Sequence, residues 1–294
     1  MTSHTSPLAR FHFGLLGAGR VGTAVSCLLR AAGHVPVGVW SRSEASARKA
    51  ARSLGSRTVD SPGDLGGCEV VLIGASDPAI ADVAETMAPH VAPGVKVVHF
   101  AGSLGLEPLG PVSHAGALAC ALHPVQSCPD VDRAVRRLPG SAWGVTCSTA
   151  AEDWAIGLVE GDLAGRAVKV AETDRRAWHA AAVMTSNGLA ALLGGGEAVL
   201  RALQVDAPRA VLAPLAEGTL RNAVEADDGI GLTGPVARGE TATVEGHLSA
   251  LADVDRGLAE IYADVARVIV SGALWTGGID DHTAHEMRSL LERT

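Results

Sequence analysis

The side chains that could transfer a proton or hold a substrate carboxylate occur in three short segments. His123 precedes Pro124, and His179 lies in the segment WHAAAVMTSN at residues 178–187. A histidine ring exchanges protons near neutral pH, so His123 is the leading candidate for an acid or base, with a buried structural ring as the alternative. Arg238, in the loop LTGPVARG, could hold a carboxylate in a bidentate pair or form a structural salt bridge.

A glycine-rich segment that could bind phosphate lies near the start of the chain. It spans residues 17–22, after the apolar run Phe11–Leu16 and before an amphipathic stretch. Between a strand and a helix, such glycines permit a tight turn, close approach to a pyrophosphate and close packing, although they could also form a simple turn. N–H groups at the helix start would face the anion. We predict that a dinucleotide contacts Gly17, Ala18, Gly19, Arg20, Val21 and Gly22.

The residues after the apolar run Val35–Trp40 indicate which dinucleotide is bound. An acidic residue there would bind a ribose 2′-hydroxyl and repel a 2′-phosphate. This chain has Ser41, Arg42 and Ser43 instead. An arginine can pair with the phosphate, and serines can donate hydrogen bonds to it. We therefore predict NADP(H) as the cofactor; the alternative is that Arg42 is solvated and Glu44 binds the ribose.

Polar residues also follow three other predicted strands. Ala75, Ser76 and Asp77 come after Val70–Ile73, and we predict that they contact the cofactor. Ser103 and His123 follow the next two apolar runs. Because ligands of open α/β sheets bind beyond the carboxyl ends of the strands, we expect both side chains near the reacting end of the cofactor. Turn formation alone would also explain Asp77-Pro78 and Gly102.

Residues 1–170 alternate short apolar runs with helix-like stretches, which is typical of a parallel sheet covered by helices. Ser43 is predicted to cap a helix that closes at Gly55. We expect an α/β Rossmann domain with a doubly wound parallel sheet. Its predicted strands are Phe11–Leu16, Val35–Trp40, Val70–Ile73, Lys96–Phe100, Leu118–Leu122, Trp143–Thr146 and Ala167–Val170.

Residues 171–294 change to a period near 3.6, which predicts an all-helical second domain. Its predicted helices are Asp174–Leu193, stopped by Gly194, Gly195 and Gly196, then Gly196–Leu203, Arg209–Val224, Thr241–Leu251 and Asp253–Gly272, with a loop at Asp227–Gly239. One apolar stripe contains Val254, Leu258, Ile261, Tyr262, Val265 and Ile269. Together with the Ala-rich segment Ala180–Leu193, this stripe predicts a homodimer joined through the helical domain.

Composition excludes several classes of function. The chain has 294 residues, a net charge of −8 and no basic cluster, so we expect no nucleic-acid partner. Its start, MTSHTSPLAR, lacks the apolar core of a signal peptide, and no run approaches the roughly 18 apolar residues of a membrane helix. Five cysteines without a CxxC pair indicate reduced thiols in a cytoplasmic protein. His282 and His285 resemble a metal pair only weakly, so no metal is expected.

Several motifs together resemble a known family. Residues 17–22, HPVQS at 123–127, WHAAAVMTSN at 178–187 and LTGPVARGETATVEGHL at 232–248 resemble proteins that join a Rossmann-like domain to a helical C-terminal domain of unknown function. That family is related to pyrroline-5-carboxylate reductase and ketopantoate reductase. The resemblance implies a 6-phosphogluconate-dehydrogenase-like architecture, with a Rossmann domain over 1–170 and a helical substrate and dimerisation domain over 171–294.

The resemblance implies an NADPH-dependent reductase of a small 2-oxo acid, with ketopantoate of pantothenate biosynthesis as the leading substrate. His123 would donate the proton, Ser103 and Asn187 would contact the carbonyl, and Thr233, Gly234 and Arg238 would hold the carboxylate. The chain departs from ketopantoate reductases in one respect, because Val183 stands where they carry a lysine four residues before the asparagine. His179 shares a helical face with Val183 and could take over proton donation.

Two other functions stay open at this stage. A cyclic-imine reductase of the pyrroline-5-carboxylate reductase type would rely mainly on Thr233 and backbone contacts. A non-catalytic module that senses NADP(H) is favoured by the missing lysine. Incubation with NADPH and a panel of 2-oxo acids and cyclic imines would separate all three.

Overall fold

The structure is a computed structural model that describes residues 8–226 and 231–292. The chain forms two compact units, Met1–Ser186 and Asn187–Thr294, which we call unit 1 and unit 2. Unit 1 extends past residue 170 because the helix that follows its last strand begins on the sheet. The predicted division of roles at residue 170 stays a prediction. The start of the polar N-terminal stretch, residues 1–7, and the first four residues of the predicted loop Asp227–Gly239 lie outside the described residues.

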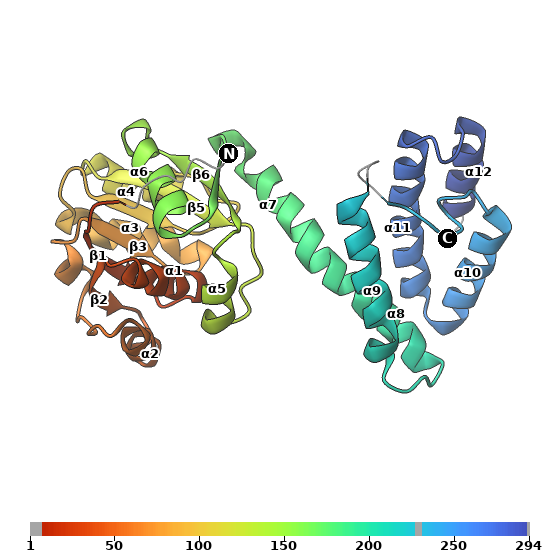
Figure 1. Cartoon of the computed structure of the whole chain (residues 1–294), viewed down its shortest axis with the longest axis horizontal. Helices are drawn as coiled ribbons and strands as arrows, with labels where there is room; N and C mark the ends of the chain where they lie inside the picture. Colours follow the sequence, from red (N-terminus) through yellow and green to blue (C-terminus); the bar gives the residue numbers. More distant parts are fainter. Residues whose placement is uncertain (1–7, 227–230, 293–294) are drawn as a thin grey trace. The chain divides into compact units, whose positions relative to one another are not determined.

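A seven-stranded sheet forms the centre of unit 1 (Figure 1). Its strands are β1 (His12–Leu16), β2 (Val35–Trp40), β3 (Val70–Ile73), β4 (Lys96–His99), β5 (Leu118–Pro124), β6 (Ala142–Cys147) and β7 (Arg166–Lys169), in the spatial order β2-β1-β3-β4-β5-β6-β7. The first five strands are parallel, which confirms the predicted Rossmann sheet. β6 runs antiparallel to β5, and β7 is parallel to β6.

The reversal at β6 follows from the segment that precedes it. A parallel crossover must carry the chain back along the sheet, and it usually does so through a long helix. The helix here, α5 (Val131–Arg137), has seven residues and spans about 10 Å. It packs on α1 rather than crossing the sheet, and Val125 N–H continues the antiparallel pairing by donating to the Ala142 carbonyl. Apolar runs alone do not carry this directional information.

Helices cover both faces of the sheet, because the strands are apolar on both sides. Val70 and Leu72 of β3 pack in one core, and Val71 and Ile73 pack in the other. The covering helices include α1 (Arg20–Ala31), α2 (Glu44–Leu54), α3 (Ile80–Met87), α4 (Gly110–His114), α5 and α6 (Glu152–Gly157). As predicted, the Ser43 side chain caps α2 and Gly55, at φ +57°, ends it.

The helix after β7 begins in unit 1 and leads into unit 2. It comprises α7 (Arg175–Val183), a π-helical segment at Met184–Gly188, and α8 (Leu189–Ala202). The prediction that the three glycines at 194–196 end a helix is wrong, because α8 runs through them. A reason lies at Gly196, where an added Cβ would stand 3.1 Å from the Leu212 side chain. The glycine therefore permits close packing of α8 on α9 (Pro208–Glu225).

The core of unit 2 is built from three helices: α10 (Thr241–Val254), α11 (Arg256–Trp275) and α12 (Asp281–Leu291). α11 contributes mostly small residues to this core, namely Ala263, Ala266, Val270 and Ala273. The predicted apolar stripe is divided: Tyr262 and Ile269 are partly buried and pack against this core, whereas Ile261 is 49% exposed. Alanines allow helices to approach closely, which is why the face of α11 that is fully buried consists mostly of small residues.

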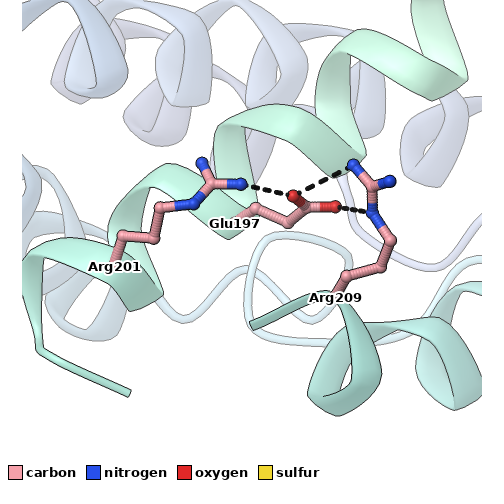
Figure 2. Close-up of polar contacts among 3 residues, drawn as sticks. All are labelled: Glu197, Arg201 and Arg209. Carbon is pink, nitrogen blue, oxygen red and sulfur yellow. Dashed lines mark hydrogen bonds and ion pairs between the residues drawn. The ribbon is translucent and has the colours of Figure 1, made fainter. Parts of the chain in front are cut away.

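A buried carboxylate connects α8 to α9 (Figure 2). Glu197 is the buried side chain of α8, and it accepts hydrogen bonds from Arg201 at 2.7 Å and from Arg209 at 2.6 Å and 3.2 Å. These arginines reach solvent at their outer ends and cover the carboxylate. Their hydrogen bonds and charges, those of Arg209 above all, lower the pKa of Glu197. Within the described parts of the chain, no helix has the length and apolar character needed to span a membrane.

Candidate active site

The glycine-rich turn after β1 is held against the end of β3. Gly17 has φ +85°, a conformation that favours glycine, and its N–H donates to the Trp40 carbonyl. An added Cβ on Gly19 would lie 2.3 Å from the Gly74 carbonyl oxygen, and one on Gly22 would lie 2.6 Å from the Gly74 Cα. These positions therefore need glycine because two backbone segments pack together. The prediction that Gly19 also lets the backbone approach a pyrophosphate stays a prediction.

A cavity of about 370 Å³ opens over this turn, entirely within unit 1. Its lining includes residues predicted to bind the cofactor, together with Phe100, Ala101 and Cys128, which sequence reasoning missed. The predicted residues in the lining are Gly19, Arg20, Val21, Gly22, Ala75 and Asp77. α1 has glycine at its N-cap and no side-chain cap or acidic residue in its first turn. Its first N–H groups and the positive end of its dipole can therefore serve an anion in this cavity.

The segment after β2 presents a positive side chain. Arg42 is exposed, whereas Glu44, the alternative ribose ligand, is paired with Arg48 on α2. Ser43 accepts hydrogen bonds from Ser46 N–H at 3.3 Å and from the Ser46 hydroxyl at 3.1 Å, so its oxygen is engaged in capping while its own proton can still be donated. This arrangement is suited to a phosphate beside Arg42.

His123 lies half-buried at the end of β5, and its ring is oriented by Trp178. The indole N–H of Trp178 donates to His123 Nδ1 at 3.2 Å, so the neutral ring carries its proton on Nε2. Gly144 lies in β6 and pairs with His123 of β5. It makes room for the indole, since an added Cβ would lie 2.6 Å from Trp178 Nε1. Sequence reasoning missed Trp178, although it stands beside His179 in the segment that we had singled out.

The His123 ring is in contact with His179 and lies beside the loop after β4. The rings of His123 and His179 are 5.3 Å apart in a T-shaped contact. An added Cβ on Gly102 would lie 2.2 Å from His179 Cδ2 and 2.9 Å from His123 Nε2, so glycine is required there. Ser103, the next residue, is partly buried. Unit 1 thus brings together His123, His179 and the Gly102–Ser103 loop.

Electrostatics keep His123 neutral near pH 7. Burial lowers its pKa to about 4, assisted by the charges of Arg175 and His179. A neutral imidazole can donate a hydrogen bond through Nε2–H, but it does not hold the extra proton of an imidazolium acid. The proton-donor role assigned to His123 from the sequence stays a prediction, and the structure gives this ring the character of a neutral hydrogen-bond donor.

The other predicted site residues belong to unit 2. Asn187 lies in the π-helical segment, a kind of irregularity that often occurs at functional sites. Thr233 and Gly234 lie in the loop before α10, and Arg238 pairs with Glu240 at 2.6 Å, as expected for a structural salt bridge. Val183 is 38% exposed, and Lys169, one of the three lysines, pairs with Glu152 in unit 1. Unit 1 alone therefore contains the cofactor cavity and the histidine pair.

No metal centre is evident in the part of the chain that the structure describes, since no three His, Cys, Asp or Glu side chains cluster suitably. His282 contacts Glu286 at 3.5 Å on the exposed side of α12, and both side chains are more than half exposed. His247, on α10, hydrogen-bonds with the Tyr262 hydroxyl of α11 at 2.9 Å.

Comparison with known families and structures agrees with this architecture. The Rossmann-like domain family matches residues 2–124, and a domain of unknown function, DUF2520, matches residues 141–269. This confirms the resemblance inferred from the motifs, whereas its suggested relation to ketopantoate reductase stays a prediction. A search of curated protein sequences returns no match.

Several solved structures share the fold. A protein from Bacteroides fragilis, provisionally assigned as an NADP oxidoreductase, is 23% identical, with a TM-score of 0.74 over 88% of this chain and 98% of that one. An imine reductase from Myxococcus stipitatus in complex with NADP⁺ is 16% identical, with a TM-score of 0.65 over 94% and 99%. A pyrroline-5-carboxylate reductase from Coxiella burnetii is 13% identical, with a TM-score of 0.58 over 96% and 99%. At these identities, the likeness establishes the fold.

Proposed function

From the premise that this chain joins a Rossmann-like domain to a DUF2520 domain, we propose that it is an NADP(H)-dependent reductase of a small unsaturated substrate. The cavity over the start of α1 carries the proposal, because its lining runs from the glycine-rich turn to the ends of β3 and β4, next to Gly102, which lies beside His123. The names of the structural relatives, an NADP oxidoreductase and two reductases, support the same class of reaction.

The cofactor would be held at two places in unit 1. N–H groups at the start of α1 would bind the pyrophosphate, and Arg42 would pair with the 2′-phosphate. NADPH supplies a hydride when it is bound. The absence of a carboxylate at the end of β2, together with the engagement of Glu44 by Arg48, favours NADPH over NADH.

The state of His123 favours a carbon–nitrogen double bond as the hydride acceptor. Hydride addition to a protonated imine, C=NH⁺, gives the neutral amine directly, so the reaction needs no proton from the enzyme after the transfer. Hydride addition to a ketone leaves an alkoxide that must take up a proton. Because the pKa of His123 is about 4, its ring has no extra proton to give near pH 7. A cyclic imine is therefore the favoured substrate. Because a protonated imine nitrogen has no free lone pair, His123 Nε2–H would instead donate to another acceptor of the substrate, such as a carboxylate.

A 2-oxo acid such as ketopantoate is the second candidate, supported by two hydrogen-bond donors, one on His123 and one on Ser103. The ring Nε2–H and the Ser103 hydroxyl could both donate to a carbonyl oxygen, and the proton would then come from solvent or from His179. The roles that the sequence predicts for Arg238, the Thr233–Gly234 loop and Asn187, in holding a substrate carboxylate and orienting the reacting group, stay predictions.

We also propose that the protein acts as a homodimer joined through unit 2. α9 extends over 18 residues without burying one of them. Large apolar side chains are exposed on α8, α9 and α11, namely Leu189, Leu192, Val211, Leu215, Leu220, Val224, Ile261, Val268 and Trp275, and at Leu203, directly after α8. Apolar surface of this extent on a soluble protein marks an interaction site, and a second copy offers the same surface in return.

The deciding experiment follows NADPH absorbance with purified protein, cyclic imines with and without a carboxylate, and 2-oxo acids that include ketopantoate. We expect turnover with a cyclic imine and NADPH, and weaker turnover with NADH. Turnover confined to a 2-oxo acid would replace the imine assignment. Tight NADPH binding without turnover of any substrate in the panel would favour a sensing module and overturn the reductase proposal.

A further inference from the structure

An arginine to which sequence reasoning gave no role is buried at the carboxyl ends of the central strands. Arg175 begins α7, and its side chain is fully buried. Its guanidinium donates to four backbone carbonyl oxygens: Nε to Leu104 at 3.0 Å, Nη1 to Gly144 at 3.1 Å and Ala121 at 3.4 Å, and Nη2 to Ala101 at 2.6 Å. Backbone dipoles rather than a carboxylate therefore solvate this buried charge.

The four carbonyls belong to the three segments that surround His123. Ala101 and Leu104 flank Gly102 and Ser103 in the loop after β4. Ala121 lies in β5, two residues before His123, and Gly144 is the residue of β6 that pairs with His123. A single planar side chain thus sets the spacing between the Ser103 loop and the His123 strand. The shape of guanidinium suits this task, because its N–H groups point in fixed directions within one plane.

Two further side chains hold the same loop. His99, buried at the end of β4, accepts from Ala101 N–H at 3.2 Å through Nδ1 and bonds the Gly105 carbonyl at 2.7 Å through Nε2. Glu172 accepts from Leu106 N–H at 2.7 Å. Glu172 is also the carboxylate whose charge acts on Arg175, but its hydrogen bond goes to the loop backbone and not to the guanidinium. The loop is fixed at both ends of Ser103, as expected for a preorganised site.

Arg175 also sets the position of the residues that contact the His123 ring. Trp178 and His179 follow it by three and four residues, so all three lie on one face of α7. We propose that Arg175 is a positioning residue of the reductase site: it anchors α7 to the strand ends so that Trp178 holds His123 as a neutral Nε2–H donor facing the Ser103 loop. This inference rests on the proposed function, but its structural part can be measured without turnover.

The charge of Arg175 acts in the same direction as its geometry. The groups whose charges act on His123 are Arg175 and His179, both on α7, and both oppose protonation of the ring. On the β4 side, His99 is itself kept neutral, with a pKa lowered to about 4, chiefly by burial. A buried cation in a region of low dielectric constant therefore favours the form of His123 that accepts from Trp178 and donates from Nε2.

The test compares Arg175→Met and Arg175→Lys with Arg176→Met, an exposed neighbour that loses the same charge. Nitrogen-15 NMR of the histidine rings, recorded on the cofactor-free full chain, reports the charge and tautomer of His123. In the wild type we expect a neutral Nε2–H ring down to about pH 5. Arg175→Met should raise the proton affinity of His123 roughly three- to tenfold. Arg176→Met should leave it unchanged.

Turnover gives the second readout. Arg175→Lys keeps the charge but loses the planar fork, so we expect kcat to fall roughly 100-fold while the affinity for NADPH is retained. A charged His123 at pH 6 in the wild type would overturn the inference, even if neither variant folds. So would a folded Arg175→Met protein with the wild-type His123 titration and kcat. If no substrate is turned over, the NMR result still decides the positioning role, and the failure falls on the proposed reductase function alone.

Discussion

The two units of this molecule bury their residues in opposite ways. In unit 1 the strands and helices enclose two apolar cores, and Phe13, Leu15 and Leu72 are among the fully buried side chains. In the described part of unit 2, α10, α11 and α12 share such a core with Val236 and Ile279 of the adjoining loops, and α8 buries a carboxylate instead of an apolar side chain. Unit 1 thus packs its large apolar side chains in its own two cores, whereas unit 2 leaves many large apolar side chains exposed.

The buried charges show the same difference. Arg175 of unit 1 is satisfied by four rigid backbone carbonyls from three segments of one sheet. Glu197 of unit 2 is satisfied by Arg201 and Arg209, whose long side chains are 60% and 76% exposed. Backbone acceptors fix a geometry that can serve catalysis, while flexible side chains tie two helices together at a surface. The proposal that unit 1 carries the chemistry and unit 2 the assembly is tested by four changes.

The largest effect is expected from a charge on the apolar face of α9. Leu215 is 67% exposed and Val211, one turn earlier, is 54% exposed. Leu215→Glu should weaken dimerisation roughly 1,000-fold, because an unpaired charge would be buried in the interface. Light scattering at micromolar concentration would measure the change. Ala81→Glu, an exposed site on α3, adds the same charge and should stay dimeric; a monomeric wild type would contradict the assignment.

The next effect concerns the ring at the centre of unit 1. His123→Ala should lower kcat roughly 100- to 1,000-fold, because it removes a hydrogen-bond donor that positions the substrate, and it should leave NADPH affinity nearly unchanged. His114→Ala, an exposed histidine on α4, serves as the control. Near-wild-type kcat for His123→Ala would transfer the role to His179 or to water.

The pH profile sharpens the same prediction. Since the pKa of His123 is about 4, the ring stays neutral from about pH 5 upward, and its contribution to kcat should be constant through neutral pH. An imidazolium acid would instead give a rate that falls as pH rises. The folded pKa is lower than the unfolded value of about 6.5, so the stability that His123 contributes is present above that value. It is lost as pH falls toward about 4, which thermal unfolding at several pH values would show.

A smaller effect is expected at the cofactor end of unit 1. Arg42→Ala should weaken NADPH binding by about 1.5–3 kcal/mol, the contribution of hydrogen bonds to a charged group, and should leave NADH binding nearly unchanged. Calorimetry with both cofactors would measure it, with Arg52→Ala, exposed on α2, as the control. Equal losses for NADPH and NADH would remove Arg42 from the 2′-phosphate site.

The smallest effect is expected at the carboxylate of unit 2. Arg209, followed by Arg201, lowers the pKa of Glu197, so the stability it contributes is present above the unfolded pKa of about 4.3 and is lost as pH falls through the folded value. Glu197→Gln should therefore unfold at a lower temperature than the wild type near pH 7, and this difference should vanish in acid. Glu217→Gln, exposed on α9, should show no such dependence. A constant difference at every pH would mean that charge is not the cause.

Local sequence patterns by themselves determined most of the secondary structure and the cofactor turn. The predicted strands Val35–Trp40 and Val70–Ile73 coincide with β2 and β3, because an apolar run bounded by turn residues is a local signal. The Ser43 cap and the Gly55 stop were equally readable, since each depends on neighbours within a few residues. The residues that bind ligands stay a prediction, and the structure adds which of them line the cavity over the start of α1.

Only the tertiary structure decided how distant segments use those elements. Arg175 meets carbonyls that lie between 31 and 74 residues away in the chain, so nothing beside it in the sequence marks it as buried. The reversal of β6, the alanine face of α11 and the continuation of α8 through its glycines likewise depend on partners from other elements. Periodicity shows that a helix has an apolar side, but the volume of the neighbouring side chains decides which side is buried.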